Sequence, residues 1–168
     1  AAICEADAAG LVDVEIENAR KTLSKLEEVA AVKAAAKESL DAAMRSRWIT
    51  NLEVAIAEAA EAGFTTEELG SARTVLEEEC RKTRARENLA VAVDSREIEE
   101  LQAAIDEAKA AALESSEYED AVHMLSKERR TAEARQALTR GCASSNIMQL
   151  QAAISQATAA ELSNEEMA

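Results

Sequence analysis

The sequence contains no proline and only four glycines among its 168 residues. Both residues interrupt regular structure, so their scarcity favours long helices joined by very short turns. Aromatic residues make up only 2% of the chain, although 48% of its residues are hydrophobic. Because alanine supplies most of the apolar positions, the sequence predicts a thin core in which helices pack closely against helices.

Features of membrane and secreted proteins are also missing. No run of about 18 apolar residues occurs, and no secretory signal is recognisable. The three cysteines, Cys4, Cys80 and Cys142, are scattered and odd in number, which argues against a disulfide framework and favours a reducing compartment. The sequence does not fix the compartment. We expect an intracellular protein, cytoplasmic by default, with an organelle such as a plastid as the alternative.

Acidic residues outnumber basic residues by 33 to 19, and the formal net charge is −14. A charge of this sign repels nucleic-acid phosphates and anionic lipid surfaces at long range. The sequence therefore predicts no nucleic-acid binding and no membrane span. It favours protein partners that are basic or neutral at the contact.

One pattern is repeated along the chain about every 49 residues. Its clearest element is LQAAI, which occurs at Leu101–Ile105 and again at Leu150–Ile154. Self-similarity at a fixed period is the signature of a repeat protein, in which each unit buries its apolar face against its neighbours. The predicted fold is all-α without strands: tandem antiparallel helical hairpins that form an α-solenoid or an elongated helical array.

We expect this array to extend over residues 1–168 as a single domain. Its predicted units are 1–45, 46–94, 95–143 and 144–168, of which the first and last are incomplete repeats. Because both ends of the sequence cut through a repeat, we expect the chain to belong to a longer polypeptide.

Helix ends can be placed from recurring turn and capping residues. Turns are predicted at Gly10–Leu11, Gly63–Phe64, Ala112–Leu113 and Glu161–Leu162. The predicted N-caps, two residues farther on, are Asp13, Thr66, Ser115 and Asn164. Ser46, Ser95 and Ser144 are each predicted to stand immediately before a shorter helix. These signals predict helices near 2–9, 14–44, 47–62, 67–93, 96–111, 116–141 and 145–161.

An apolar stripe at steps of three and four residues defines the expected core. Leu101, Ile105, Leu125 and Leu138 are predicted to be buried within it. The first unit has four extra residues between Leu23 and Leu40. An insertion of four keeps a helix continuous but rotates its downstream face, so we expect a longer or slightly rewound helix there.

No motif for catalysis or for cofactor binding is present, and we expect a protein that is not an enzyme. His123 is the only histidine, and its spacing from Asp120 is that of half a di-metal helix motif. One histidine does not supply such a site, so no metal ligands are predicted; Glu119 is instead a surface partner one turn away.

Basic residues recur at two repeat positions. Lys37, Arg86 and Arg135 share one position, and Arg81 and Arg130 share the other. One interpretation is a groove for an acidic peptide or phosphate, because stacked repeats present recurring residues as a strip. The other is ordinary helix support through ion pairs four residues apart, such as Glu77 with Arg81.

Four further residues are candidate contacts with a partner. Trp48 stands where the other units have Glu97 and Asn146, and is either a local packing plug or an exposed anchor. In the last unit, Ile147, Leu150 and Ile154 lack the long helix that follows in the middle units. We expect another chain or further repeats to cover these three residues.

The A-G-F turn at Ala62–Phe64, the E-E-L entry at Glu67–Leu69, the LQAAI core and the arginine-rich runs together resemble the tandem α-helical hairpin repeats of many long dinoflagellate and related microalgal proteins. The resemblance covers nearly the whole chain. It implies a non-catalytic scaffold or linker that mediates protein–protein interaction. The alternative is an accessory subunit of a large assembly, such as a membrane-associated or photosynthetic complex of an alga.

Overall fold

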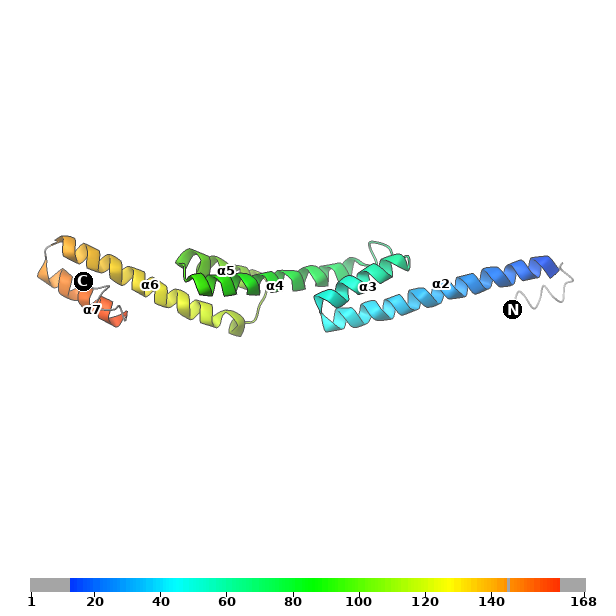
Figure 1. Ribbon diagram of the computed structural model, residues 1–168, viewed down its shortest axis with the longest axis horizontal. Helices are drawn as coiled ribbons and strands as arrows, with labels where there is room; N and C mark the ends of the chain where they lie inside the picture. Colours follow the sequence, from blue (N-terminus) through cyan, green and yellow to red (C-terminus); the bar gives the residue numbers. More distant parts are fainter. Residues whose placement is uncertain (1–12, 145, 161–168) are drawn as a thin grey trace. The chain divides into compact units, whose positions relative to one another are not determined.

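The computed structural model describes residues 13–144 and 146–160, and every regular element in this part of the chain is an α-helix (Figure 1). The helices are α2 (Asp13–Ser46), α3 (Ile49–Glu61), α4 (Gly70–Ser95), α5 (Ile98–Ala110), α6 (Ser115–Ser144) and α7 (Ile147–Ala159). The predicted all-α fold without strands is thus confirmed for these residues. The helix expected near residues 2–9 lies outside them.

The chain divides into two units, residues 1–80 and 81–168, and the boundary falls within α4. In the first unit α2 packs against α3. In the second unit α6 packs against both α5 and α7. Long helices of 26 to 34 residues therefore alternate with short helices of 13 residues along the described chain.

Three buried clusters follow one another along the chain. In the first, the C-terminal part of α2 packs with α3 and the first turns of α4. The second combines the C-terminal part of α4, the whole of α5 and the first half of α6. The third joins the end of α6 to α7. Leu101, Ile105, Leu125 and Leu138 lie in these clusters and are buried, as predicted.

Small residues lie where each long helix meets its short partner. Ala43, Ala92 and Gly141, which are spaced 49 residues apart, are buried on α2, α4 and α6. A Cβ at Gly141 would lie 3.3 Å from the Cα of Leu150 and 3.4 Å from the Cβ of Ala153. Backbones this close leave no room for large side chains, which is why a core almost free of aromatic residues fits the fold.

A serine closes each turn from a long helix to a short one. Ser46, Ser95 and Ser144 are the last residues of α2, α4 and α6 rather than residues directly before a short helix, which corrects the prediction. Each hydroxyl donates to the carbonyl oxygen three residues earlier, at 3.0, 3.2 and 2.9 Å. Each also accepts from the amide two residues later, at 3.5, 3.4 and 3.3 Å. The residue in between has a positive φ at Arg47 (56°) and Arg96 (58°).

The turns from short to long helices use a different cap. Gly63 has φ 84° and Ala112 has φ 55°, as expected for the predicted turn positions. The amide of Phe64 donates to the oxygen of Ala59 at 3.0 Å, and the amide of Leu113 donates to that of Ala108 at 3.0 Å. These are Schellman caps, in which the amide of the residue after the left-handed one donates to a carbonyl oxygen in the last turn of the helix.

The predicted N-caps are wrong: Thr66 lies in the turn before α4 (Gly70–Ser95), and Ser115 is already the first residue of α6. Thr65 and Glu68 form a capping box: the amide of Thr65 donates to Glu68 Oε2 at 2.7 Å, and the amide of Glu68 donates to Thr65 Oγ1 at 3.3 Å. In the next turn the amide of Glu114 donates to Glu117 Oε1 at 3.3 Å. The Thr65–Glu68 box lies in the turn before α4, which begins at Gly70, three residues later than predicted; α6 begins at Ser115, one residue earlier than predicted. The predicted cap Asn164 lies outside the described residues.

The longer first helix is confirmed. α2 is one uninterrupted helix of 34 residues, and the four extra residues lengthen it without a break. Every residue from 17 to 32 is exposed, including Leu23, Leu26, Val29 and Val32. Within the described residues, this part of α2 has an apolar face without a packing partner.

Burial of equivalent leucines differs, and a matched pair of substitutions tests it. Leu101 is fully buried on α5, whereas Leu150 is half-buried at the equivalent position of α7. We expect Leu101→Ala to lower the free energy of unfolding by about 2–4 kcal/mol and Leu150→Ala by less than about 2 kcal/mol, because the second creates a smaller cavity. Urea denaturation measures both. Equal losses would contradict the difference in packing.

The Schellman caps predict opposite effects of two reciprocal substitutions. Ala112 carries a Cβ at a positive φ, so Ala112→Gly is expected to stabilise the chain by about 0.5–1 kcal/mol. Gly63→Ala is expected to destabilise it by about 1 kcal/mol, through backbone strain alone. A Cβ there would lie 3.9 Å from the nearest side-chain atom, which is ordinary contact. Thermal unfolding that shifts in the same direction for both variants would contradict this assignment.

Candidate functional site

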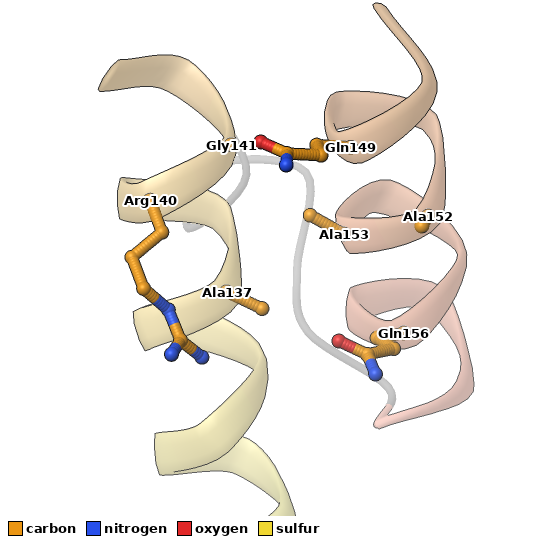
Figure 2. A pocket seen from close by; sticks show the side chains of 7 residues that line it. All are labelled: Ala137, Arg140, Gly141, Gln149, Ala152, Ala153 and Gln156. Atoms are coloured by element: carbon orange, nitrogen blue, oxygen red, sulfur yellow. The ribbon is translucent and has the colours of Figure 1, made fainter. Parts of the chain in front are cut away.

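A shallow groove opens on each described hairpin between the end of the long helix and the short helix. The volumes are about 420 Å³ between α2 and α3, 220 Å³ between α4 and α5, and 340 Å³ between α6 and α7. Nearly the same repeat positions line all three. The lining residues of the third groove are Ala137, Arg140, Gly141, Gln149, Ala152, Ala153 and Gln156 (Figure 2).

A polar bridge crosses the first two grooves but not the third. Ser39 Oγ donates to Glu58 Oε2 at 3.2 Å, and Asn88 Nδ2 donates to Glu107 Oε2 at 2.6 Å at the equivalent positions. In the third groove these positions are Ala137 and Gln156. The alanine has no polar side-chain atom, so it forms no such bridge.

The charge of the grooves also changes along the chain. The first is lined by one carboxylate, Glu58, and the second by two, Glu100 and Glu107. The third contains Arg140 and two neutral glutamines. In Figure 2 Gln149 and Gln156 extend from α7 toward α6. The third groove thus offers amide donors and acceptors with a positive charge, in a chain whose net charge is −14.

Trp48 is exposed, so the interpretation of this residue as a packing plug is wrong. Its side chain is 69% exposed, and it occupies the N-cap position of α3 without a side-chain cap hydrogen bond. At the equivalent position of α7, Asn146 Oδ1 accepts from the amides of Met148 and Gln149 at 2.9 and 3.3 Å. Indole has a donor but no acceptor, so Trp48 is unable to cap in this way.

Arg47, next to Trp48, ties the turn to α4. Its Nε donates to Glu79 Oε1 at 2.6 Å and its Nη2 donates to Glu78 Oε2 at 2.7 Å. These hydrogen bonds, first from Glu79 and then from Glu78, raise the pKa of Arg47 above its ordinary value. Arg47 and Glu78 are exposed, so their pair orients the turn more than it stabilises it, whereas the side chain of Glu79 is only 14% exposed. The residue 49 positions after Glu78 is Lys127, so the same two-carboxylate arrangement is not encoded there.

The five predicted basic residues lie on α2, α4 and α6 and have different surroundings. Arg86 donates to both carboxylate oxygens of Glu117, at 2.6 and 3.3 Å, and so joins α4 to the start of α6. Arg130 Nε donates to the carbonyl oxygen of Ser126 on its own helix at 3.3 Å, and the residue lines a groove beside the end of α7. The structure therefore gives Arg86 a structural role. Binding of an acidic ligand by Lys37, Arg81, Arg86, Arg130 and Arg135 stays a prediction.

The exposed face of α7 combines apolar side chains with an absence of charge. Ile147 is 75% exposed, Met148 79% and Ile154 45%. None of the 13 residues of α7 is charged, whereas α3 and α5 each carry several carboxylates. Of the predicted contact residues, Ile147 and Ile154 are exposed and Leu150 is half-buried. Met148 was not among the predicted contact residues; the uncharged sequence IMQLQAAISQATA of α7 was the signal that could have identified this face.

The described part of the chain was also searched for metal-ligating clusters, reactive thiols and membrane-spanning helices. No cluster of three metal-ligating side chains occurs among residues 13–144 and 146–160. His123 Nε2 lies 3.8 Å from Glu119 Oε1 in an exposed contact between adjacent turns, as predicted. Cys80 and Cys142 are exposed free thiols. None of the described helices is both long and apolar enough to cross a membrane.

Comparisons of the chain with protein-family models, with curated proteins and with solved structures found no match.

The contact between Arg86 and Glu117 predicts a pH dependence of stability. The hydrogen bond from Arg86 lowers the pKa of Glu117 below its ordinary value of 4.5. A carboxylate with a lowered pKa in the folded state contributes stability above that ordinary value, and the contribution is lost as the pH falls through the folded-state pKa. We expect Glu117→Gln to flatten the loss of stability below pH 4.5.

Glu87→Gln, on the exposed surface of α4, is the control and should leave the acid limb of the stability curve as in the parent chain. Urea midpoints measured between about pH 3 and 7 compare the three proteins. If Glu117→Gln retained the full acid dependence of the parent, Glu117 would not be a source of that dependence.

Proposed function

We propose that this chain is a non-catalytic α-helical repeat scaffold whose hairpins bind protein partners. In this proposal, tandem hairpins of about 49 residues form an array, as the resemblance to the microalgal hairpin repeats implies. The turn serine and a packing leucine are the same in each hairpin and form a constant framework. Residues on the outside of each hairpin determine what binds there.

The recurrence of the same turn contacts and buried residues in successive hairpins supports the proposal. The hydroxyls of Ser46, Ser95 and Ser144 make the same two contacts in three turns. Leu40, Leu89 and Leu138 are buried at one repeat position. Repeat proteins keep such packing residues constant because each unit depends on its neighbours for burial.

The exposed positions between these packing residues change from one hairpin to the next. The cap position of the short helix is Trp48, then Glu97, then Asn146. A second groove position is Ala42, Val91 and Arg140. A constant interior with a changing surface is the arrangement expected of a scaffold with several distinct contacts.

Trp48 is the observation that carries the proposal. An asparagine at this position would make the cap bonds that Asn146 makes, and losing an N-cap costs about 1 kcal/mol. Trp48 makes no cap bond and exposes the largest side chain of the sequence to solvent. A residue that breaks a local rule without a structural gain marks a functional position, and tryptophan is enriched where proteins bind each other.

The uncharged face of α7 favours the alternative that the chain is an accessory subunit held permanently in a larger assembly. Charged residues are depleted at the centre of protein interfaces, and methionine is enriched there. In this alternative Ile147, Met148 and Ile154 lie against another subunit. The two functions differ in whether the chain is stable by itself or only within the complex.

A substitution that separates stability from binding tests the scaffold proposal. We expect Trp48→Asn to stabilise the chain by about 1 kcal/mol, because it creates the missing cap. The same variant is expected to lose the partner that copurifies with the parent chain. Glu97→Asn, at the equivalent position, is the matched control: it should gain similar stability and keep the partner.

Fluorescence of the parent chain gives an independent measurement, because Trp48 is its single tryptophan. Acrylamide should quench the emission readily in the isolated chain and less readily in the complex. Recovery of the same partner by the parent and by Trp48→Asn, with equal quenching before and after binding, would show that Trp48 is not an anchor.

A further inference from the structure

The grooves of the first two hairpins share an apolar lining and an exposed valine. Val54 of α3 is 57% exposed in the first groove, and Val91 of α4 is 64% exposed in the second. Each groove therefore offers a branched aliphatic side chain beside a surface of methyl groups. The methyl groups belong to the alanines of the lining: Ala42 and Ala43 in the first groove, and Ala92, Ala103 and Ala104 in the second.

A glutamate in each groove has one carboxylate oxygen without a partner. Ser39 Oγ donates to Glu58 Oε2 at 3.2 Å, and Asn88 Nδ2 donates to Glu107 Oε2 at 2.6 Å. Within the described residues, Oε1 of neither glutamate takes part in a hydrogen bond or an ion pair. Because a carboxylate accepts at both oxygens, the bridge orients each glutamate and leaves an acceptor for a donor from outside the chain.

The negative charge of these two grooves is not neutralised by a basic residue of their lining. No lysine or arginine is among the residues that line either groove. The second groove contains a further carboxylate, Glu100, whose Oε2 accepts from Ser95 Oγ at 2.5 Å. A groove of this charge, in a chain with a net charge of −14, attracts cations and repels acidic peptides and phosphates.

Both grooves remain open although the covering long helix is present. Leu101 and Ile105 of α5 share a buried cluster with Leu125 of α6. Ala103 and Glu107 of α5 line the second groove. The first turns of α4 share a cluster with α3 in the same way. The openings at these two hairpins are therefore not explained by a missing covering helix.

We infer that the first and second grooves each bind a basic amphipathic helix of a partner protein. An aliphatic residue of that helix covers the exposed valine, and a lysine or arginine donates to Oε1 of Glu58 or Glu107. The groove-lining residues 100–107 of α5 extend over about 10 Å, which is two turns of a bound helix. The inference rests on the proposed scaffold function and names the chemistry of one partner.

The third groove differs at the positions on which this contact depends. Arg140 stands 49 residues after Val91, and Gln156 stands 49 residues after Glu107. Arg140 repels a cationic side chain, and the amide of Gln156 is a weaker acceptor than a carboxylate. We therefore expect the basic helix to bind the first and second grooves of the chain and not the third.

The test uses the full chain and a synthetic amphipathic helix with leucines on one face and lysines beside them. Isothermal titration calorimetry should give a stoichiometry of two peptides per chain, with an affinity that falls as the ionic strength rises. Two control peptides carry glutamate in place of lysine, or serine in place of leucine. Each control should bind at least about tenfold more weakly, because it lacks either the cation or the apolar contact.

Two variants exchange the chemistry of the second and third grooves. Val91→Arg with Glu107→Gln gives the second groove the residues of the third, and should lower the stoichiometry from two to one. Arg140→Val with Gln156→Glu gives the third groove the residues of the second, and should raise it to three. None of the four side chains is fully buried, so folding should be retained and is checked by circular dichroism.

Val122→Arg with Glu119→Gln makes the same change of charge on the exposed surface of α6 and is the control. Its stoichiometry should remain two. Three results would overturn the inference: no binding of the lysine peptide, equal binding of the lysine and glutamate peptides, or a stoichiometry that neither groove variant changes.

Sedimentation of the chain without peptide distinguishes another occupant. If the parent chain self-associates and Val91→Arg with Glu107→Gln abolishes the association, a second copy occupies the groove, and the inference of a basic partner helix is wrong. None of these results alters the scaffold proposal, which depends on the effect of Trp48→Asn on the partner that copurifies with the chain.

Discussion

Close packing of alanine and glycine between paired helices is the constraint on which the described structure depends. Small side chains at Ala43, Ala92 and Gly141 let each long helix approach its short partner. They also bury little apolar area, and burial contributes only about 25 cal/mol per Å². A hairpin therefore depends on leucines such as Leu52 and Leu101, and these become fully buried where the following long helix also contributes to their cluster. Where no such helix is described, as at α7, apolar residues stay exposed.

The same constraint limits functional variation among the hairpins to their outer surface. Buried positions of the hairpins are restricted to small or branched aliphatic residues, so polar or reactive side chains are rarely accommodated there. Exposed positions are free to vary, and they differ between hairpins: Trp48 and Asn146 occupy the same cap position, and Val91 and Arg140 the same groove position. These differing surfaces are the basis of our proposal that the chain binds other proteins.

Much of the helical architecture was predictable because its signals are local. The turns at Gly63 and Ala112 and the burial of Leu101 and Ile105 follow from residue type and periodicity. The helix starts were less predictable: the adjacent Thr65 and Thr66 are equally suitable caps until the glutamate three residues after Thr65 is considered, and α4 begins only at Gly70. The pair of Arg86 with Glu117 was not predictable: it joins residues 31 apart, and repeat position alone does not say which carboxylate an arginine meets.

Amide hydrogen exchange along the full chain tests the central claim most directly, because exchange rates report local opening. If packing between helices provides the stability, protection should be highest at residues 52–59 and 101–108, which carry the buried positions of α3 and α5. It should be much lower in residues 17–32 of α2, which are helical but exposed. Protection of residues 17–32 equal to that of α5, in a chain shown to be monomeric, would contradict the account.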